Sequence, residues 1–175
     1  MKTSILFVIM LIPFLTMAQE TPTIKFFEKY SGEKGYTSVY ITKNTFDFFA
    51  NISNSEDAKS FQESVSSLNS IKVLRNDGNS NNVEDNIFHT ELLPSLKKYV
   101  EILMVKEDGQ FIRIFTRKVN NKITEFVVVK YGSDENILVI MEGDDINIKQ
   151  LSGMSGTMNI AGVDHIDKID IEKVK

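Results

Sequence analysis

The chain of 175 residues contains no cysteine, two histidines and three prolines. The absence of cysteine excludes disulfide bonds, thiolate chemistry and any metal site built on cysteine. It also excludes lipid attachment through an N-terminal cysteine. Burial of hydrophobic residues, which make up 42% of the sequence, must therefore stabilise the fold.

Histidine is too scarce for the common catalytic and metal-binding constellations. Zinc requires three or four converging nitrogen, sulfur or carboxylate ligands. Neither His89 nor His165 belongs to a His-Glu-x-x-His motif. We interpret both as surface or partly buried side chains, and we expect no catalytic residue, no metal site and no cofactor from the sequence.

The charge of the chain is mildly negative and evenly spread. Its 20 Lys and Arg residues against 24 Asp and Glu residues give a net charge of −4. Scattered basic residues in an acidic chain argue against a nucleic-acid partner. Beyond the first eighteen residues, no apolar stretch approaches the roughly 20 residues that span a bilayer, so we expect no membrane span in the mature protein.

The first eighteen residues have the layout of a signal peptide. A start with one positive charge is followed by an apolar run at 5–15 and by small residues up to Ala18. The run is shorter than the roughly 20 residues of a membrane-spanning helix. The sequence therefore predicts a signal peptide at 1–18, cleavage between Ala18 and Gln19, and a single exported domain at 19–175 that is periplasmic or secreted.

Hydrophobic spacing predicts an α+β fold. Apolar residues at helical spacing predict short helices near residues 26–30, 43–50, 54–68 and 88–99. Alternating or β-branched runs predict strands at 36–41, 71–74, 100–106, 110–118, 123–131 and 137–142. Pro94 predicts a kink in the last helix, or an earlier end. We expect an antiparallel sheet with a C-terminal four-stranded meander, packed against two to three amphipathic helices.

The meander is apolar on both sides near its middle. The turns Asp108-Gly109 and Asn120-Asn121 are typical of antiparallel hairpins. A register without irregularities puts Val100, Ile102, Met104, Phe111, Phe115, Phe126, Val128, Leu138 and Ile140 on one face. The same register puts Leu103, Val105, Ile112, Ile114, Val127, Val129, Val139 and Met141 on the other. Either helices or chain ends cover both faces, or one face carries an exposed apolar patch that pairs with another molecule.

One strand face combines arginine with phenylalanine. Phe111, Arg113, Phe115 and Arg117 alternate along a single strand and therefore point to the same side. Arginine beside aromatic residues is enriched at protein interfaces. Cross-strand pairing or solvation at the sheet edge is the more common reason for such a pattern. These four residues are kept as a candidate interaction face.

The polar loop at 77–85 partly resembles a calcium-binding loop. Asp77, Asn79 and Asn81 match the first three ligand positions. Asn82 stands where a glycine is expected, and Phe88 stands where a bidentate glutamate is expected. The sequence favours a polar loop and leaves open whether it binds a metal.

Shorter motifs carry little weight. Ser31 and Ser95 each begin a Ser-x-x-Lys motif, without the companion elements of the enzymes that use it. Residues 153–157 narrowly miss a nucleophile elbow. The carboxylate pair Asp144-Asp145 is typical of a solvated turn.

Taken from end to end, the chain resembles a known family. The matching pieces are FEKY at 27–30, GYTSVYI at 35–41, IKVL at 71–74, YVEILMV at 99–105, NKITEFVVV at 121–129, ILVIMEGD at 137–144 and MNIAGVDH at 158–165. In this order they resemble domain-of-unknown-function family 4252, which occurs in exported proteins of Bacteroidota. The resemblance implies a periplasmic or secreted location and supplies no activity. Many relatives look like lipoproteins, whereas Ala18-Gln19 in this chain argues for a free soluble form.

Two functions remain open at the level of the sequence. The first is a non-catalytic interaction module of the cell envelope, which binds a protein partner or forms a homo-oligomer. The second is a small-ligand-binding protein or hydrolase whose polar residues converge only in the fold. A concave pocket with two or more acidic or histidine side chains would favour the second function, and a flat sheet face would count against it.

Overall fold

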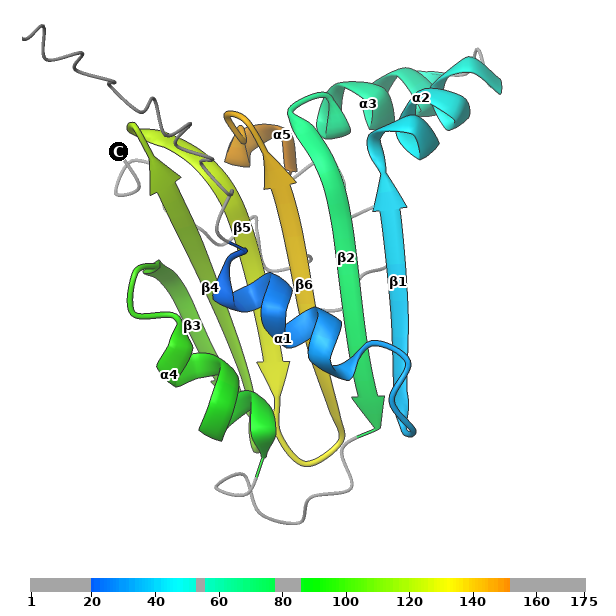
Figure 1. Cartoon of the computed structure of the whole chain (residues 1–175). Coiled ribbons are helices and arrows are strands. Elements are labelled where there is room, and N and C mark those ends of the chain that lie inside the picture. Colours follow the sequence, from blue (N-terminus) through cyan, green and yellow to red (C-terminus); the bar gives the residue numbers. More distant parts are fainter. Residues whose placement is uncertain (1–19, 53–55, 78–85, 152–175) are drawn as a thin grey trace, which may run out of the picture.

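The protein is built on one antiparallel sheet (Figure 1). The computed structural model describes residues 20–52, 56–77 and 86–151. The strands are β1 (Tyr36–Thr42), β2 (Leu68–Asp77), β3 (Val100–Glu107), β4 (Gln110–Val119), β5 (Lys122–Tyr131) and β6 (Glu135–Gly143). They lie in the order β1-β2-β6-β5-β4-β3, and every neighbouring pair is antiparallel. The predicted α+β class and the C-terminal meander are confirmed.

Short helices connect and cover the strands. They are α1 (Pro22–Tyr30), α2 (Lys43–Ile52), α3 (Glu56–Val65), the π-helix η2 (Phe88–Leu92), α4 (Leu93–Ser95) and α5 (Ile148–Leu151). α1 begins at a proline, which is tolerated in the first turn because its missing N–H has no intrahelical acceptor there. The last predicted helix ends early, at Ser95 rather than near residue 99, and Pro94 lies in its final turn.

The hairpin turns adopt the backbone conformation that the sequence predicts. Asp108 and Gly109 have φ angles of 49° and 77°, and Asn120 and Asn121 have φ angles of 52° and 64°. Two successive residues with positive φ match the right-handed twist of the flanking strands. These turns therefore set the pairing at one end of each hairpin.

Two β-bulges change the register that regular hairpins would give. Val119 pairs with Lys122 and Lys118 with Ile123, whereas Arg117 pairs with Glu125, so Thr124 is the extra residue of β5. Because side chains alternate with a period of two, one extra residue reverses the face of every residue beyond it. The predicted assignment of β5 is therefore wrong, since Phe126 and Val128 lie with Ile114 and not with Phe115.

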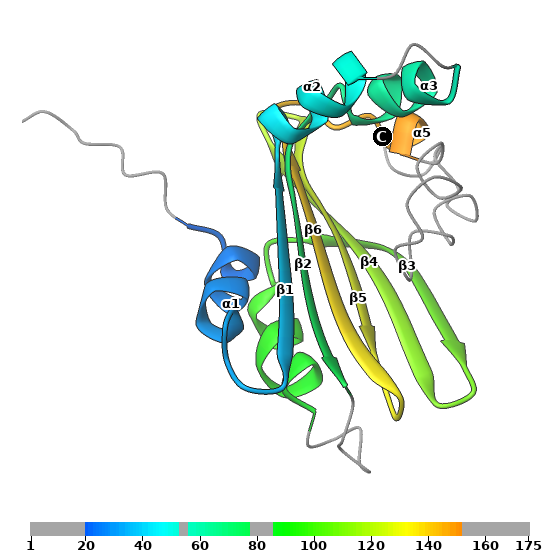
Figure 2. The ribbon, with the colours of Figure 1, turned by 90° about the vertical axis from the view of Figure 1, so that its right-hand side faces the viewer.

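Helices lie over one face of the sheet and at one end of it (Figure 2). We call the face under α1, η2 and α4 the first face. The opposite face is the second face, and residues of α2, α3 and α5 at the end of the sheet pack with its core. The first face buries Val127, Val129, Leu138 and Ile140, among others. The second face buries Ile114, Phe126, Val128, Val139 and Met141, among others. The predicted two-sided apolar sheet is confirmed.

The two outer strands are more exposed than the four inner ones. Val39 and Tyr40 on β1 and Val100 and Met104 on β3 are exposed apolar side chains. In the part of the chain that the structure describes, no helix has both the length and the apolar character needed to cross a membrane.

Candidate functional site

A row of polar residues crosses the first face near one end of the sheet. Arg117 of β4 pairs with Glu125 of β5, Glu125 with Glu142 of β6, Glu142 with Ser70 of β2, and Ser70 with Thr42 of β1. Residues directly opposite each other in antiparallel strands have Cβ atoms about 4.5–5.5 Å apart. The register therefore brings five polar side chains from five strands onto one line.

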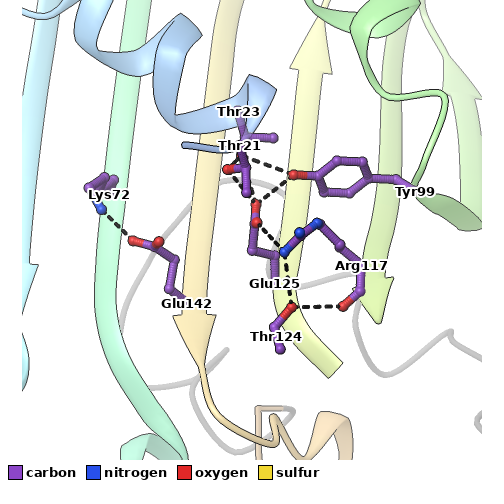
Figure 3. Close-up of polar contacts among 8 residues, drawn as sticks. All are labelled: Thr21, Thr23, Lys72, Tyr99, Arg117, Thr124, Glu125 and Glu142. Carbon is purple, nitrogen blue, oxygen red and sulfur yellow. Dashed lines mark hydrogen bonds and ion pairs between the residues drawn. The ribbon is translucent and has the colours of Figure 1, made fainter. Parts of the chain in front are cut away.

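Glu125 is the most buried residue of this row, with 3% of its surface exposed. Its Oε2 accepts hydrogen bonds from Thr23 Oγ1 and Tyr99 Oη, each at 2.7 Å, and from Thr21 Oγ1 at 3.3 Å (Figure 3). A buried carboxylate is tolerated only where donors replace its lost hydration. The start of α1 and the residue before β3 supply these donors.

Arg117 provides the positive charge next to Glu125. Its Nη1 lies 3.5 Å from Glu125 Oε1 and 3.4 Å from the hydroxyl of Thr124, the bulged residue (Figure 3). The hydroxyl of Thr124 in turn donates to the carbonyl oxygen of Arg117. The bulge thus brings the hydroxyl of Thr124 into contact with Arg117, next to the buried carboxylate of Glu125.

Tyr99 acts as a hydrogen-bond donor to Glu125. Burial raises the pKa of the Tyr99 hydroxyl above its ordinary value, and the neighbouring Glu125 carboxylate raises it further. The hydroxyl therefore keeps its proton at neutral pH. It holds one carboxylate oxygen of Glu125 in place.

Glu142 forms the second acidic centre of the row. Its Oε2 accepts a hydrogen bond from Ser70 Oγ at 2.7 Å. The same oxygen forms an ion pair with the largely buried ammonium of Lys72 (Figure 3). The Lys72 Nζ also lies 4.7 Å from the centre of the Tyr40 ring. Among the described residues, none forms a hydrogen bond with Glu142 Oε1, so one carboxylate oxygen is available to a ligand.

The polar row forms part of a groove of about 620 Å³ between the start of α1 and the ends of the strands. Its lining consists of Glu20, Thr21, Ile24, Tyr40, Asn69, Ser70, Arg117, Thr124, Glu125, Glu142, Gly143 and Asp144. Four of these side chains are carboxylates and one is an arginine. The groove therefore carries an excess of negative charge, which favours cationic ligands.

The arrangement suits binding better than acid–base catalysis. Glu125 and Glu142 are direct cross-strand neighbours, a like-charge pairing that is unfavourable by itself. Arg117 offsets the charge of Glu125, and Lys72 offsets that of Glu142. Glu125 is also enclosed by three hydroxyl donors, so its carboxylate is committed to the fold.

No candidate metal centre lies within residues 20–52, 56–77 and 86–151. No group of three or more His, Cys, Asp or Glu side chains that could hold a metal ion occurs there. Of the candidate calcium loop at 77–85, Asp77 is the last residue of β2, and residues 78–85 lie outside the described residues, as do His165 and residues 153–157.

The candidate interaction face from the sequence lies on the first face. Phe115 is buried there in the core, and Phe111 stacks on Tyr131 with ring centres 5.0 Å apart. Arg113 forms a two-pronged pair with Glu101, with N–O distances of 3.0 and 2.5 Å. Of the four predicted residues, Arg117 lines the groove. An interaction role for the set stays a prediction.

Other residues singled out in the sequence have local roles. His89 is exposed and stacks on Tyr131 with ring centres 5.7 Å apart. Ser31 donates a hydrogen bond to Ser38, and Ser95 donates one to the carbonyl oxygen of Leu92. These serines satisfy nearby polar groups.

The residues that organise the groove are not among those that the sequence predicts as site residues. Lys72, Glu125 and Glu142 are charged residues inside apolar strands, and this interruption was the available signal. Their alignment depends on the Thr124 bulge and on the pairing of β2 with β6. Tyr99 lies in the segment that leads into β3 and not in the helix that the sequence predicts near residues 88–99.

The fold and its site define a small α+β domain with an acidic groove at the end of its sheet. The chain matches the family described as a domain of unknown function (DUF4252) over residues 30–154, and it belongs to that family. The match includes Tyr99, Arg117, Glu125 and Glu142 and begins after Thr21 and Thr23. No curated protein and no solved structure matches the chain.

Proposed function

We propose that the protein is an exported, non-catalytic binding module whose groove receives a positively charged side chain of a partner protein. The observation that carries this proposal is the excess of carboxylates in the groove, together with the available Oε1 of Glu142. Carboxylate oxygens are the natural acceptors for ammonium and guanidinium groups. Asp144 and Glu20 add further negative charge to the lining.

The floor of the groove is organised before any ligand arrives. Glu125 is fixed by hydroxyl groups from α1 and from Tyr99, and Glu142 is fixed by Ser70 and Lys72. A prearranged site loses little conformational entropy when it binds. Such a floor supports recognition and requires no bond to be made or broken.

The extent of the groove favours a polypeptide ligand. Its lining runs from Arg117 on β4 to Tyr40 on the edge strand β1. The five strands crossed are separated by four spacings of about 4.8 Å, or roughly 19 Å in all. An extended segment of a partner would follow this length and place a lysine or arginine beside Glu142.

Export is supported by the sequence at the start of the chain. The apolar run at 5–15 and the small residues before Gln19 have signal-peptide form. Cleavage after Ala18 would leave Glu20 and Thr21, which line the groove, at the start of the mature chain. The family resemblance to exported proteins points in the same direction.

A small cationic ligand is the second candidate. A concave groove lined by several carboxylates is the feature expected of a small-ligand-binding protein. The shared chemistry of both candidates is a primary ammonium or guanidinium group. The two candidates predict different affinities. A small-ligand site would bind a free amine more tightly than a peptide, and a peptide site would do the reverse.

NMR titration of the ¹⁵N-labelled protein tests both candidates. The probes are a short lysine- and arginine-containing peptide, spermidine, and a peptide with glutamate at the cationic positions. We expect the cationic peptide to shift the amide signals of Glu125, Glu142 and Gly143, and the acidic peptide to leave them unchanged. Stronger binding of spermidine than of the peptide would favour the small ligand.

Paired substitutions provide the control for the titration. Glu142→Gln with Asp144→Asn should weaken binding at least about tenfold, or roughly 1.4 kcal/mol. Glu101→Gln with Glu107→Gln changes the net charge equally on the β3 edge and should have little effect. Absence of binding by every cationic probe, or equal loss in both double variants, would contradict the proposal.

A further inference from the structure

The two edge strands of the sheet differ in their protection against pairing. An edge strand presents unpaired N–H and C=O groups, and natural sheets block them with charges, prolines or bulges. β3 contains Glu101, Lys106 and Glu107, and its pairing with β4 shifts at Ile102. β1 reads Tyr-Thr-Ser-Val-Tyr-Ile-Thr and pairs with β2 without a register shift. β3 therefore carries protection that β1 lacks.

We propose that the outer edge of β1, with which no other described strand pairs, pairs antiparallel with β1 of a second copy of this chain. The four residues from Thr37 to Tyr40 are exposed, and Val39 and Tyr40 expose 45% and 58% of their surfaces. Because β1 carries no charge, two copies meet along it without repulsion. A charge-free edge also lacks the groups that would select a different partner by electrostatic complementarity.

Symmetry determines the register of this pairing. Two residues that lie opposite each other in an antiparallel sheet have their side chains on the same face. A two-fold axis between two residues of β1 would pair side chains that point to opposite faces. The axis that relates the two copies must therefore pass beside a residue. An axis beside Val39 pairs all seven residues of β1 and sets Tyr40 opposite Ser38 of the second copy. The result is one continuous sheet with six strands from each copy.

Neighbouring elements extend the contact. α2 follows β1 directly and projects past the same edge of the sheet (Figure 1). In the pair, the start of α2 would lie beside the turn before β1 of the second copy. Tyr40 also lines the acidic groove, so pairing places both grooves on the same face of the joined sheet. The pairing itself does not depend on what the groove binds.

Cysteine cross-linking tests the register directly, because the chain has no cysteine of its own. Val39→Cys puts two cysteines opposite each other at about 4.5–5.5 Å between Cα atoms, within the roughly 4.4–6.8 Å range of disulfides. Thr37→Cys lies on the same face, but its two copies would be about 13 Å apart along the strands. We expect oxidation to give a covalent dimer with Val39→Cys and none with Thr37→Cys.

Light scattering coupled to size-exclusion chromatography provides a second measurement, on protein expressed from the full sequence. We expect the unsubstituted protein to have twice the chain mass, and Val39→Lys to raise the dissociation constant at least about tenfold. Met104→Lys, at an exposed position on the other edge, should leave the dimer intact, and circular dichroism should show both variants folded. A monomeric unsubstituted protein, an undisturbed Val39→Lys dimer, or a monomer that pairs through β1 with a different protein would overturn the proposal.

Discussion

Glu125 connects the candidate site to the core of the protein. Its carboxylate joins α1, Tyr99, β4 and β5 through hydrogen bonds and an ion pair, while its strand neighbours Val127 and Val129 are fully buried. A buried charge is stable only while its partners remain. The residue that shapes the groove is therefore also a residue on which folding depends.

Replacement of Glu125 should destabilise the protein markedly. Glu125→Ala removes the acceptor for three hydroxyl groups and leaves Arg117 without its carboxylate. Hydrogen bonds to charged groups contribute about 1.5–3 kcal/mol each, so we expect urea unfolding to show a loss of at least about 3 kcal/mol. Glu101→Ala, which breaks the more exposed pair with Arg113, should cost about 1 kcal/mol or less. Equal losses would show that the buried network contributes little.

Tyr99 should make stability fall at high pH. Its folded-state pKa is raised by burial above the ordinary 10.0, so above that pH the unfolded state loses its proton first and is favoured. Tyr99→Phe should cost roughly 1.5–3 kcal/mol at neutral pH because a hydrogen bond to a carboxylate is lost. The difference from the unsubstituted protein should shrink as the pH rises above 10.0. A difference that stays constant in urea unfolding would exclude this role.

At the scale of elements, the bulge in β5 is the feature that decides which residues share a face. Thr124 is inserted between Ile123 and Glu125, and its hydroxyl interacts with Arg117. Residues from Glu125 onward are shifted by one position relative to a regular hairpin. Glu125 consequently lies on the first face beside Tyr99, under α1.

Deletion of Thr124 should be tolerated, whereas deletion of Val127 should not. Without Thr124, the turn at Asn120-Asn121 still sets Arg117 opposite Glu125, so the faces of β5 are kept. We expect a loss of about 1–2 kcal/mol from the missing hydrogen bonds and cooperative unfolding by circular dichroism. Deletion of Val127 moves the rest of β5 to the opposite faces and should abolish cooperative unfolding. Loss of folding on deletion of Thr124 would contradict this interpretation.

The sequence predicted the elements better than it predicted their alignment. Local spacing was sufficient for the strands of the meander and for turns such as Asn120-Asn121, because these depend on neighbouring residues. The face of Phe126 was predicted incorrectly because no local signal marked Thr124 as a bulge. The groove was not predicted because Glu125, Glu142 and Lys72 meet through long-range pairing.

At the scale of the whole molecule, the residues that stabilise the fold and the surfaces proposed for binding lie in different parts of the sheet. Both faces bury apolar residues near the middle of the sheet, while the polar groove lies at one end of the first face and β1 forms an outer strand. The groove and the edge meet at Tyr40. This layout leaves two surfaces for binding without opening the core.

Photo-crosslinking in the native host tests the central claim, that the groove is the binding site. A photoreactive residue replaces Asn69, which is exposed and lines the groove, and in a control it replaces the exposed Lys97 beyond α4. We predict that one reproducible partner is captured from position 69 and not from position 97, and that Glu142→Gln with Asp144→Asn removes it. Equal capture from both positions, or capture that survives the double substitution, would contradict the account.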